Sequence, residues 1–520
     1  MKLIQENFFI RRGPFEQKIG FHYFINDTPF RHIFKHQITD LILHNNDKYD
    51  NAILSNIYTK DVYAYIMVFF QSLKILKIIA SSEYDYPPLV IWNHQSTTCF
   101  SSTLTVLCIT VFGFDHCLLL LDGRLKQLTT FKVQVHAISR SMLIDCNKND
   151  LINLKCFSLT NYNYTYEYEY DDLVVPLLRR MTYLEKLTLC LRIQKVGRFV
   201  SGASLSIDDA HLHNEILVHM PQLHTFKFYI STETNAIYSN LRFSNDDIQQ
   251  TFINMKYGQT ACIMDYYGAC GTLCHVYSLP FTFTHLHKIT THFPFIVFDT
   301  VTNLFVYDIF PFEHEFFMRI NQTFPLLKCF TIENDRREHW NYDDNPSYSI
   351  IESTHLTSLE ITHAGQYYVE QFLVKTNTLL PRLTRLKVEY NDLKTIATNF
   401  TREETRHNCS KLRINYKYII IFILSFIFKI DYARISSDEE NCDELQENNK
   451  IVSHQDFATV LNRKLTLKLK KCKAPKVSRG YSAKRLRTDD ISPPPAKDMG
   501  VGFRFQYYDI INIFLRFCGA

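Results

Sequence analysis

Apolar residues recur in one short phrase along most of this chain. In three clear copies, FPLLKCFTI from Phe324, STHLTSLEI from Ser353 and LPRLTRLKV from Leu380, an apolar anchor is followed by apolar residues three and five positions later. Residues two apart face the same way only in extended chain. The phrase therefore predicts a bend that leads into a β-strand. The residues expected to point into a common core are Phe330 and Ile332, Leu359 and Ile361, and Leu386 and Val388.

The phrase occurs eleven times, and its anchors are Ile38, Leu73, Leu104, Leu128, Leu154, Leu184, Leu223, Leu304, Leu327, Leu356 and Leu383. The last three anchors are 29 and 27 residues apart, which leaves room for one strand, one helix and two connections. A unit of this size cannot bury its own apolar face and must stack on its neighbours. Residues 38–414 are therefore predicted to form an α/β solenoid of irregular repeats, a curved parallel sheet with outer helices.

Helices and one insertion are expected between these strands. Apolar residues at helical spacing predict helices over 313–320 and 367–374, and Ser244 or Asn245 is placed to cap a third. The interval between Leu223 and Leu304 holds no clean copy of the phrase. Its two β-like runs, 259–267 and 272–281, flank a short glycine-bearing loop and predict a hairpin. We expect an irregular insertion at about 231–303.

The two ends of the chain differ from the repeats. Residues 1–37 have no clear period and are interpreted as an N-terminal cap. Residues 415–430 are apolar, but the uncharged run 418–428 is shorter than the roughly 20 residues of a membrane-spanning helix, so a buried strand or terminal cap is favoured over a membrane segment. Blocks of like charge in 431–520 predict a disordered C-terminal tail.

Composition narrows the classes of function and the compartment. Basic residues are in excess only after residue 430, which leaves the repeats near neutral and gives no reason to expect nucleic acid. The start, MKLIQENFFIRRG, lacks the apolar core of a secretory signal, so we expect a cytoplasmic protein with reduced cysteines. The basic run KKCKAPKVSRGYSAKRLR resembles a two-part import signal, which makes the nucleus the alternative.

Catalytic signatures are not found in the sequence. It has no Gly-rich phosphate loop, HExxH, CxxC pair or nucleophile elbow, so we expect no enzyme and no cofactor. Cys262, Cys270, Cys274 and His275 are the best metal candidates, but no recognised finger spacing completes them, and no metal site is predicted. His314 and Glu315 could form an acid–base pair, or could simply begin a helix.

Alternate strand residues are expected to line the exposed concave face of the stack. A mixed polar ribbon of this kind suits a protein partner with an acidic patch better than a small molecule, which needs a closed apolar pocket. The alternative is that these are merely solvated strand residues. The candidate partner-binding residues are Lys132, Lys186, Thr225, Lys227, Tyr229, Glu333, Glu360, Arg385, Lys387 and Glu389.

The repeated L-x-x-L-x-L resembles the leucine-rich repeat. The segments TPFRHIFKHQITDLILHNNDKY, YGQTACIMDYY, HVYSLPFTF, PFEHEFF, SYSIIESTHLTSLEI and VEQFLVKTNTLLPRL are similar to the F-box and leucine-rich-repeat proteins that are numerous in bdelloid rotifers. The resemblance implies a substrate receptor of a cullin ubiquitin ligase. An N-terminal F-box would dock on the cullin-ligase adaptor, and the repeats would hold the protein target.

Residues 1–37 lack the Leu-Pro-x-Glu-like phrase with which an F-box usually begins. They are therefore either an N-terminal cap or an F-box remnant. Two functions follow from this. One is a substrate receptor that binds a protein target on the concave face, and the other is a leucine-rich-repeat scaffold without a ubiquitin-ligase link.

Overall fold

The computed structural model describes residues 2–4, 35–45, 63, 66–80, 101–139, 151–195, 207–234, 244–252, 255–267, 271–294, 296–308, 311–334, 349–397 and 402–412. The predicted apolar segment 415–430 and charged tail 431–520 lie outside this part of the chain. So does most of the predicted cap 1–37, apart from residues 2–4 and 35–37.

The first sheet has ten strands in the order β1-β2-β3-β4-β5-β6-β7-β8-β10-β9. Strands β1 to β8 pair in parallel, and β9 and β10 form an antiparallel hairpin whose second strand pairs with β8. The predicted hairpin is thus confirmed. The strands are β1 Lys2–Ile4, β2 Asp40–Asn45, β3 Ile75–Ala80, β4 Val106–Gly113, β5 Thr130–Ala137, β6 Cys156–Tyr166, β7 Lys186–Lys195, β8 Thr225–Thr234, β9 Thr260–Tyr267 and β10 Gly271–Ser278.

The repeated phrase sets the register of this sheet. The second apolar residue of each copy pairs with its counterpart in the next strand, in the unbroken row Leu41, Leu76, Leu107, Phe131, Phe157, Leu187 and Phe226. All seven side chains are buried. The expected bend is present too, because the N–H of anchors such as Leu128 and Leu184 donates to the carbonyl three residues earlier.

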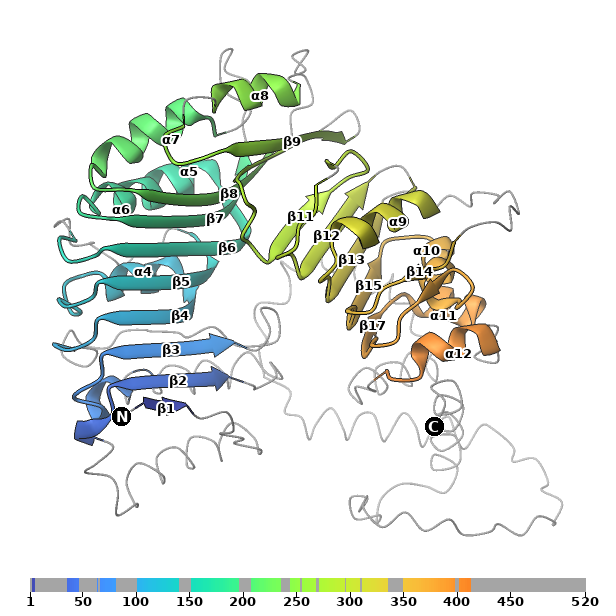
Figure 1. Ribbon diagram of the computed structural model, residues 1–520, viewed down its shortest axis with the longest axis horizontal. Helices are drawn as coiled ribbons and strands as arrows, with labels where there is room; N and C mark the ends of the chain where they lie inside the picture. Colours follow the sequence, from blue (N-terminus) through green and yellow to red (C-terminus); the bar gives the residue numbers. More distant parts are fainter. Residues whose placement is uncertain are drawn as a thin grey trace, which may run out of the picture. The chain divides into compact units, whose positions relative to one another are not determined.

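Helices cover the apolar face of the first sheet (Figure 1). Phe114 and Leu120 of α4, Leu177 of α6 and Leu212 of α7 belong to the same buried cluster as the strand leucines and phenylalanines. Ser244 caps the predicted third helix, since its Oγ accepts the N–H of Asp247 at 3.2 Å. The helical segments are α4 Phe114–Leu120, α5 Glu167–Glu169, the π-helical turn η1 Tyr170–Val174, α6 Val175–Arg179, α7 Asp209–Glu215, the 3-10 turn η2 Leu217–His219 and α8 Asn245–Thr251.

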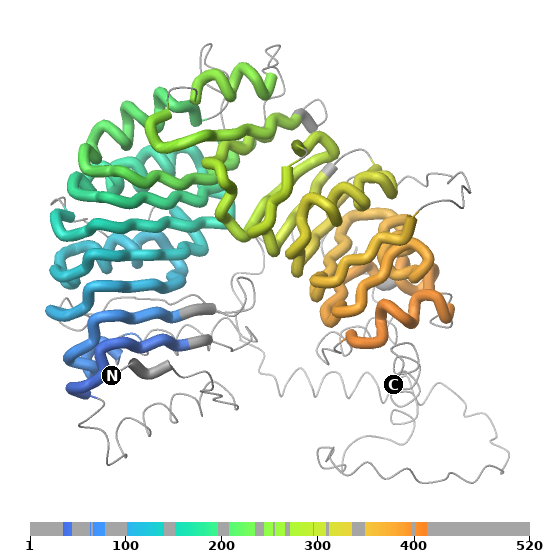
Figure 2. Tube along the Cα trace, in the orientation of Figure 1, coloured from blue at the N-terminus to red at the C-terminus, as the bar shows by residue number. Residues whose placement is uncertain are grey.

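A second sheet of five parallel strands follows the hairpin, in the order β11-β12-β13-β15-β17. The expectation of one continuous sheet is therefore wrong, because an antiparallel hairpin ends the first sheet before the second begins. Figure 2 traces this path from green through yellow to orange. The strands are β11 His285–Ile289, β12 Asn303–Asp308, β13 Cys329–Asn334, β15 Ser358–Thr362 and β17 Arg385–Lys387, with a separate parallel pair β14 Ile351–Glu352 and β16 Thr378–Leu379.

The prediction that Leu304 is the anchor of its copy of the phrase is wrong by three residues. Leu304 pairs with Phe330 and so occupies the second apolar position, not the anchor position. Val301, which is fully buried, is the anchor of this copy, and Val306 is its third apolar residue. In the two following copies, Phe330 and Leu359 are buried as expected.

The edge strand β17 is less buried than predicted. Leu386 and Val388 are half-buried because no further strand covers β17 in the described sheet. Helices α9 His314–Thr323 and α10 Gln366–Leu373 confirm the two helices predicted in this half of the chain, and α11 Tyr390–Ile396 and α12 Glu403–Cys409 follow.

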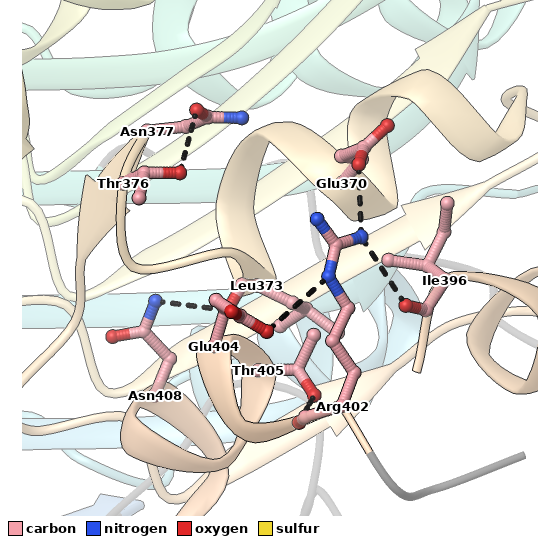
Figure 3. Close-up of polar contacts among 9 residues, drawn as sticks. All are labelled: Glu370, Leu373, Thr376, Asn377, Ile396, Arg402, Glu404, Thr405 and Asn408. Carbon is pink, nitrogen blue, oxygen red and sulfur yellow. Dashed lines mark hydrogen bonds and ion pairs between the residues drawn. The ribbon is translucent and has the colours of Figure 1, made fainter. Parts of the chain in front are cut away.

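Polar contacts connect α10 with the two helices after β17 (Figure 3). The Arg402 guanidinium donates to the Glu370 carboxylate at 3.0 Å and to the carbonyl of Ile396 at 3.4 Å. The buried Asn408 amide donates to the carbonyls of Phe372, Leu373 and Thr378, and its oxygen accepts the N–H of Leu380 at 2.9 Å. Asn408 therefore satisfies backbone groups at the end of α10 that would otherwise be buried without partners.

The described chain is thus a mixed α/β protein with two large, mostly parallel sheets, which confirms the predicted fold at this level. None of the helices in the described ranges has both the length and the apolar character needed to cross a bilayer.

We expect Leu359→Ala to lower the free energy of unfolding by about 2–5 kcal/mol, because the lost side chain leaves a cavity between β15 and its helices. Leu359 is 1% exposed, whereas Leu326, in the turn before β13, is 42% exposed and provides the matched control. Leu326→Ala should cost at most about 0.5 kcal/mol. Urea unfolding of the full-length variants measures both values, and equal costs would contradict the assigned strand register.

Candidate functional site

The polar face of the first sheet lies opposite the helix-covered core. Strand alternation places Lys132, Lys186 and Lys227 on this face, where all three are exposed, while Thr225 is half-buried. The parallel register sets Lys132, Ser158, Thr188 and Lys227 side by side in one row across β5 to β8. Four of the ten predicted residues are therefore brought together by the sheet itself.

The other charged candidates belong to the second sheet. Glu333, Glu360, Arg385 and Lys387 lie on β13, β15 and β17, and Glu360 pairs directly with Lys387 as both a strand neighbour and an ion pair. Glu389 follows β17 and occupies the N-cap position of α11, without a capping hydrogen bond from its side chain, instead of lying in a strand. The single predicted ribbon is thus divided between two sheets with different charge patterns.

Tyr229 was predicted on the exposed face, and this is wrong, since only 1% of it is exposed. The strand is ten residues long, and its carboxyl-terminal half is covered by groups from β10 and β11. The Tyr229 hydroxyl makes a hydrogen bond with Nδ1 of His275 at 3.1 Å and accepts the backbone N–H of His287 at 3.3 Å. Its ring also packs edge-on against Phe281.

The same covered region holds a group of polar side chains that we call the junction cluster: the buried Arg192, Glu233 and His275 and the half-buried His287 and Lys288. Arg192 donates to Nε2 of His287 at 3.2 Å and to the carbonyl of Tyr162 at 2.7 Å. Lys288 pairs with Glu233 at 2.5 Å. These contacts join β7 and β8 of the first sheet to β11 of the second.

Aromatic rings complete the junction cluster. The Arg192 guanidinium lies over the Tyr164 ring, 3.8 Å from its centroid, and Lys288 lies 4.8 Å from the centroid of Tyr307. The Tyr162 ring packs against the His285 ring, with centroids 4.1 Å apart. Cation–π contacts of this kind gain strength when the cation is desolvated.

Both histidines of the junction cluster are held neutral. Burial lowers the pKa of His275 to about 3, and the positive charge of Arg192 adds to this effect. The pKa of His287 is also lowered well below its usual value, first by burial and then by the charges of Arg192 and Lys288. A neutral imidazole can accept a hydrogen bond, as Nε2 of His287 does from Arg192.

Backbone geometry at Lys288 brings its side chain to Glu233. Lys288 has a φ of 61°, in the left-handed region that a lysine rarely adopts. The register of β11 against β12 shifts at the same point, between His287 and Ile289. An irregularity of this kind re-aims a side chain. The cost of the local strain indicates that the surrounding contacts hold this conformation.

The junction cluster is suited to holding two sheets together rather than to catalysis. Arg192 and Glu233 are each 5% exposed, and His275 is fully buried, so a substrate could not reach them without an opening of the structure. Sequence reasoning missed this cluster. The signal was charged or histidine residues inside strand-like runs. Arg192 and Glu233 lie beyond the end of their copies of the repeated phrase, and His287 and Lys288 lie in the run HLHKI, where no copy was recognised.

The fold separates the residues of the two remaining candidate sites, the His314–Glu315 acid–base pair and the cysteine–histidine metal site. His314 is buried and contacts Gln371 Oε1 and the Ser349 carbonyl, both at 3.1 Å, whereas Glu315 beside it is exposed. His314 and Glu315 therefore do not face one another. Because neighbours on a strand point to opposite faces, Cys274 and His275 cannot bind one ion together. Cys270 lies outside the described residues.

Metal-binding groups of three or more His, Cys, Asp or Glu side chains are not found among the described residues. Comparisons with protein-family models, with curated proteins and with solved structures found no match. The function proposed below therefore depends on the residues and their arrangement.

We expect the stability of the protein to fall as the pH drops below about 6.5. In that range the unfolded chain protonates His275 and His287, but the folded chain does not until near pH 3 for His275. Between pH 7 and pH 5 this linkage lowers the free energy of unfolding by about 2 kcal/mol for His275, and His287 adds a loss of the same sign. Urea unfolding at several pH values measures it.

The double variant His275→Gln/His287→Gln should show a shallower pH dependence, whatever its stability at pH 7. His219→Gln is the matched control, since His219 is exposed on η2. If the double variant and the control have the same slope between pH 7 and pH 5, the imidazoles of His275 and His287 are not neutral in the folded protein.

Proposed function

We propose that this chain is a protein-interaction module, a leucine-rich-repeat-like solenoid that binds a protein target on its polar strand faces. The observation that supports this most is the row of polar side chains on the side opposite the helix-covered core, in which Lys132 and Lys227 are exposed and Ser158 and Thr188 are half-buried. Successive parallel strands with equivalent apolar positions also support a repeat architecture, in which each unit covers the next.

The chemistry of this face favours a protein over a small molecule. Small-molecule sites are concave and mostly apolar, and they bury most of the ligand. Here lysines and hydroxyl groups repeat from strand to strand at a spacing of about 4.8 Å. An extended array of this kind is matched by an extended protein surface.

The resemblance to F-box and leucine-rich-repeat proteins extends the proposal to a substrate receptor of a cullin ubiquitin ligase. In this form the strand faces hold the target, and residues 1–37 dock on the ligase adaptor. A scaffold without a ligase link is the second candidate, because residues 1–37 lack the usual Leu-Pro-x-Glu-like phrase of an F-box.

If the substrate-receptor form holds, the full-length chain co-purifies with the cullin-ligase adaptor, and deletion of residues 1–37 abolishes that association. The deletion variant should still capture the same target proteins, which shows that the remaining chain is folded. A full-length chain that captures targets but no adaptor would support the scaffold instead.

Lys227→Glu/Lys387→Glu should weaken capture of target proteins at least tenfold, because it reverses charge on both polar strand faces. Both side chains are exposed, so thermal unfolding should change little.

The control Lys126→Glu/Arg382→Glu makes the same charge change at exposed turn residues outside the faces. Quantitative mass spectrometry of affinity-purified complexes compares the three proteins. Equal losses in both double variants would show that only net charge matters.

A further inference from the structure

The polar face of the first sheet carries an unbalanced positive charge. Lys77, Lys132 and Lys227 occupy the same register row, on β3, β5 and β8, and Lys186 lies in the adjacent row on β7. Lys132, Lys186 and Lys227 are exposed and Lys77 is half-buried. Within the described residues, none of the four forms an ion pair with a carboxylate.

The positions between these lysines are neutral. In the shared row they are Cys108, Ser158 and Thr188, and in the adjacent row Ile75, Val106, Thr130, Cys156 and Thr225. The adjacent row continues to Asp40 on β2, which is paired in register with Lys2 on β1. Glu185, just before β7, pairs with Lys155 at 3.0 Å, and the charge of the neighbouring Lys186 also acts on it. Strand pairing places Cys108 between Lys77 and Lys132. Burial raises the pKa of the Cys108 thiol, and the charges of Lys132 and Lys77 oppose this rise.

The polar face of the second sheet differs in its charge. On β13, β15 and β17 the two basic residues, Arg385 and Lys387, are balanced by Glu333 and Glu360, and Lys387 pairs with Glu360 on the neighbouring strand. Lys288 on β11 pairs with Glu233. The two sheets therefore offer a partner different electrostatic surfaces, although the repeated phrase builds both of them.

We infer that the first sheet binds an acidic segment of the partner protein across β3 to β8, with carboxylates on Lys77, Lys132 and Lys227. This rests on the proposed function and names the chemistry of its target. Five strand spacings of about 4.8 Å separate Lys77 from Lys227, so the segment spans about 24 Å, roughly seven residues of extended chain. Threonine and serine hydroxyls between the lysines donate further hydrogen bonds to carboxylate oxygens.

Electrostatic attraction to this row gives the interaction a clear signature. Exposed charges are screened over about 10 Å at 0.1 M salt, so binding of an acidic segment weakens as salt is added. Charge complementarity also excludes basic segments, because like charges placed together disfavour association.

The test is a selection of random 12-residue peptides, displayed on phage, against three full-length proteins. They are the wild type, the first-sheet variant Lys132→Glu/Lys227→Glu and the second-sheet variant Arg385→Glu/Lys387→Glu, which change the net charge equally. The wild type and the second-sheet variant should select peptides rich in Asp and Glu. The first-sheet variant should bind those peptides at least tenfold more weakly by fluorescence anisotropy, and their affinity for the wild type should fall as salt rises from 50 to 300 mM.

Three outcomes overturn the inference: no acidic enrichment by the wild type, equal affinity of acidic peptides for the first-sheet variant, or loss of binding in the second-sheet variant alone. The last of these leaves the proposed interaction function in place and moves the site to the second sheet. If all three proteins capture target proteins equally in cells, neither strand face binds the target, and the proposed function is rejected as well. Circular dichroism and thermal unfolding verify that each variant is folded.

Discussion

The structure depends on the register of parallel strands that carry the same apolar phrase. In a parallel sheet, equivalent positions of neighbouring strands lie side by side and point to the same face. The row from Leu41 to Phe226 is therefore buried along its length, and the residues one position later form the opposite, polar face. One constraint thus produces both the core and the surface available to a partner.

The end of the repeated phrase is as important as the phrase itself. Strands β6, β7 and β8 continue for several residues beyond it, and there Arg192 of β7 and Glu233 of β8 are buried and contact residues of β11. Arg192 and Glu233 would be costly to bury alone, but each has partners from β11. The junction cluster therefore allows the polar face of β7 and β8 to be exposed to solvent at the start of each strand and covered near its carboxyl-terminal end.

Local pattern was sufficient to predict β2 to β8, the β9–β10 hairpin, β12, β13, β15 and β17, the bends and the helices α9 and α10, because each is set by residues close in sequence. It did not predict β1, β11, β14 or β16, which carry no clear copy of the phrase. It was not sufficient to predict the division into two sheets, which depends on how the β9–β10 hairpin pairs with β8. The error at Leu304 arose because Val301, Leu304 and Val306 satisfy the same spacing three residues earlier. The exposure of Tyr229 was misjudged because the groups that cover it are about fifty residues away.

The central claim is that the polar face of the first sheet is where a partner binds. Its most direct measurement is lysine footprinting with an amine-reactive reagent on the full-length chain, free and in the complexes that it forms in cells. We predict that Lys132, Lys186 and Lys227 lose reactivity in the complex while Lys126 keeps it. Unchanged reactivity of these three lysines, with protection confined to lysines elsewhere, would contradict the account.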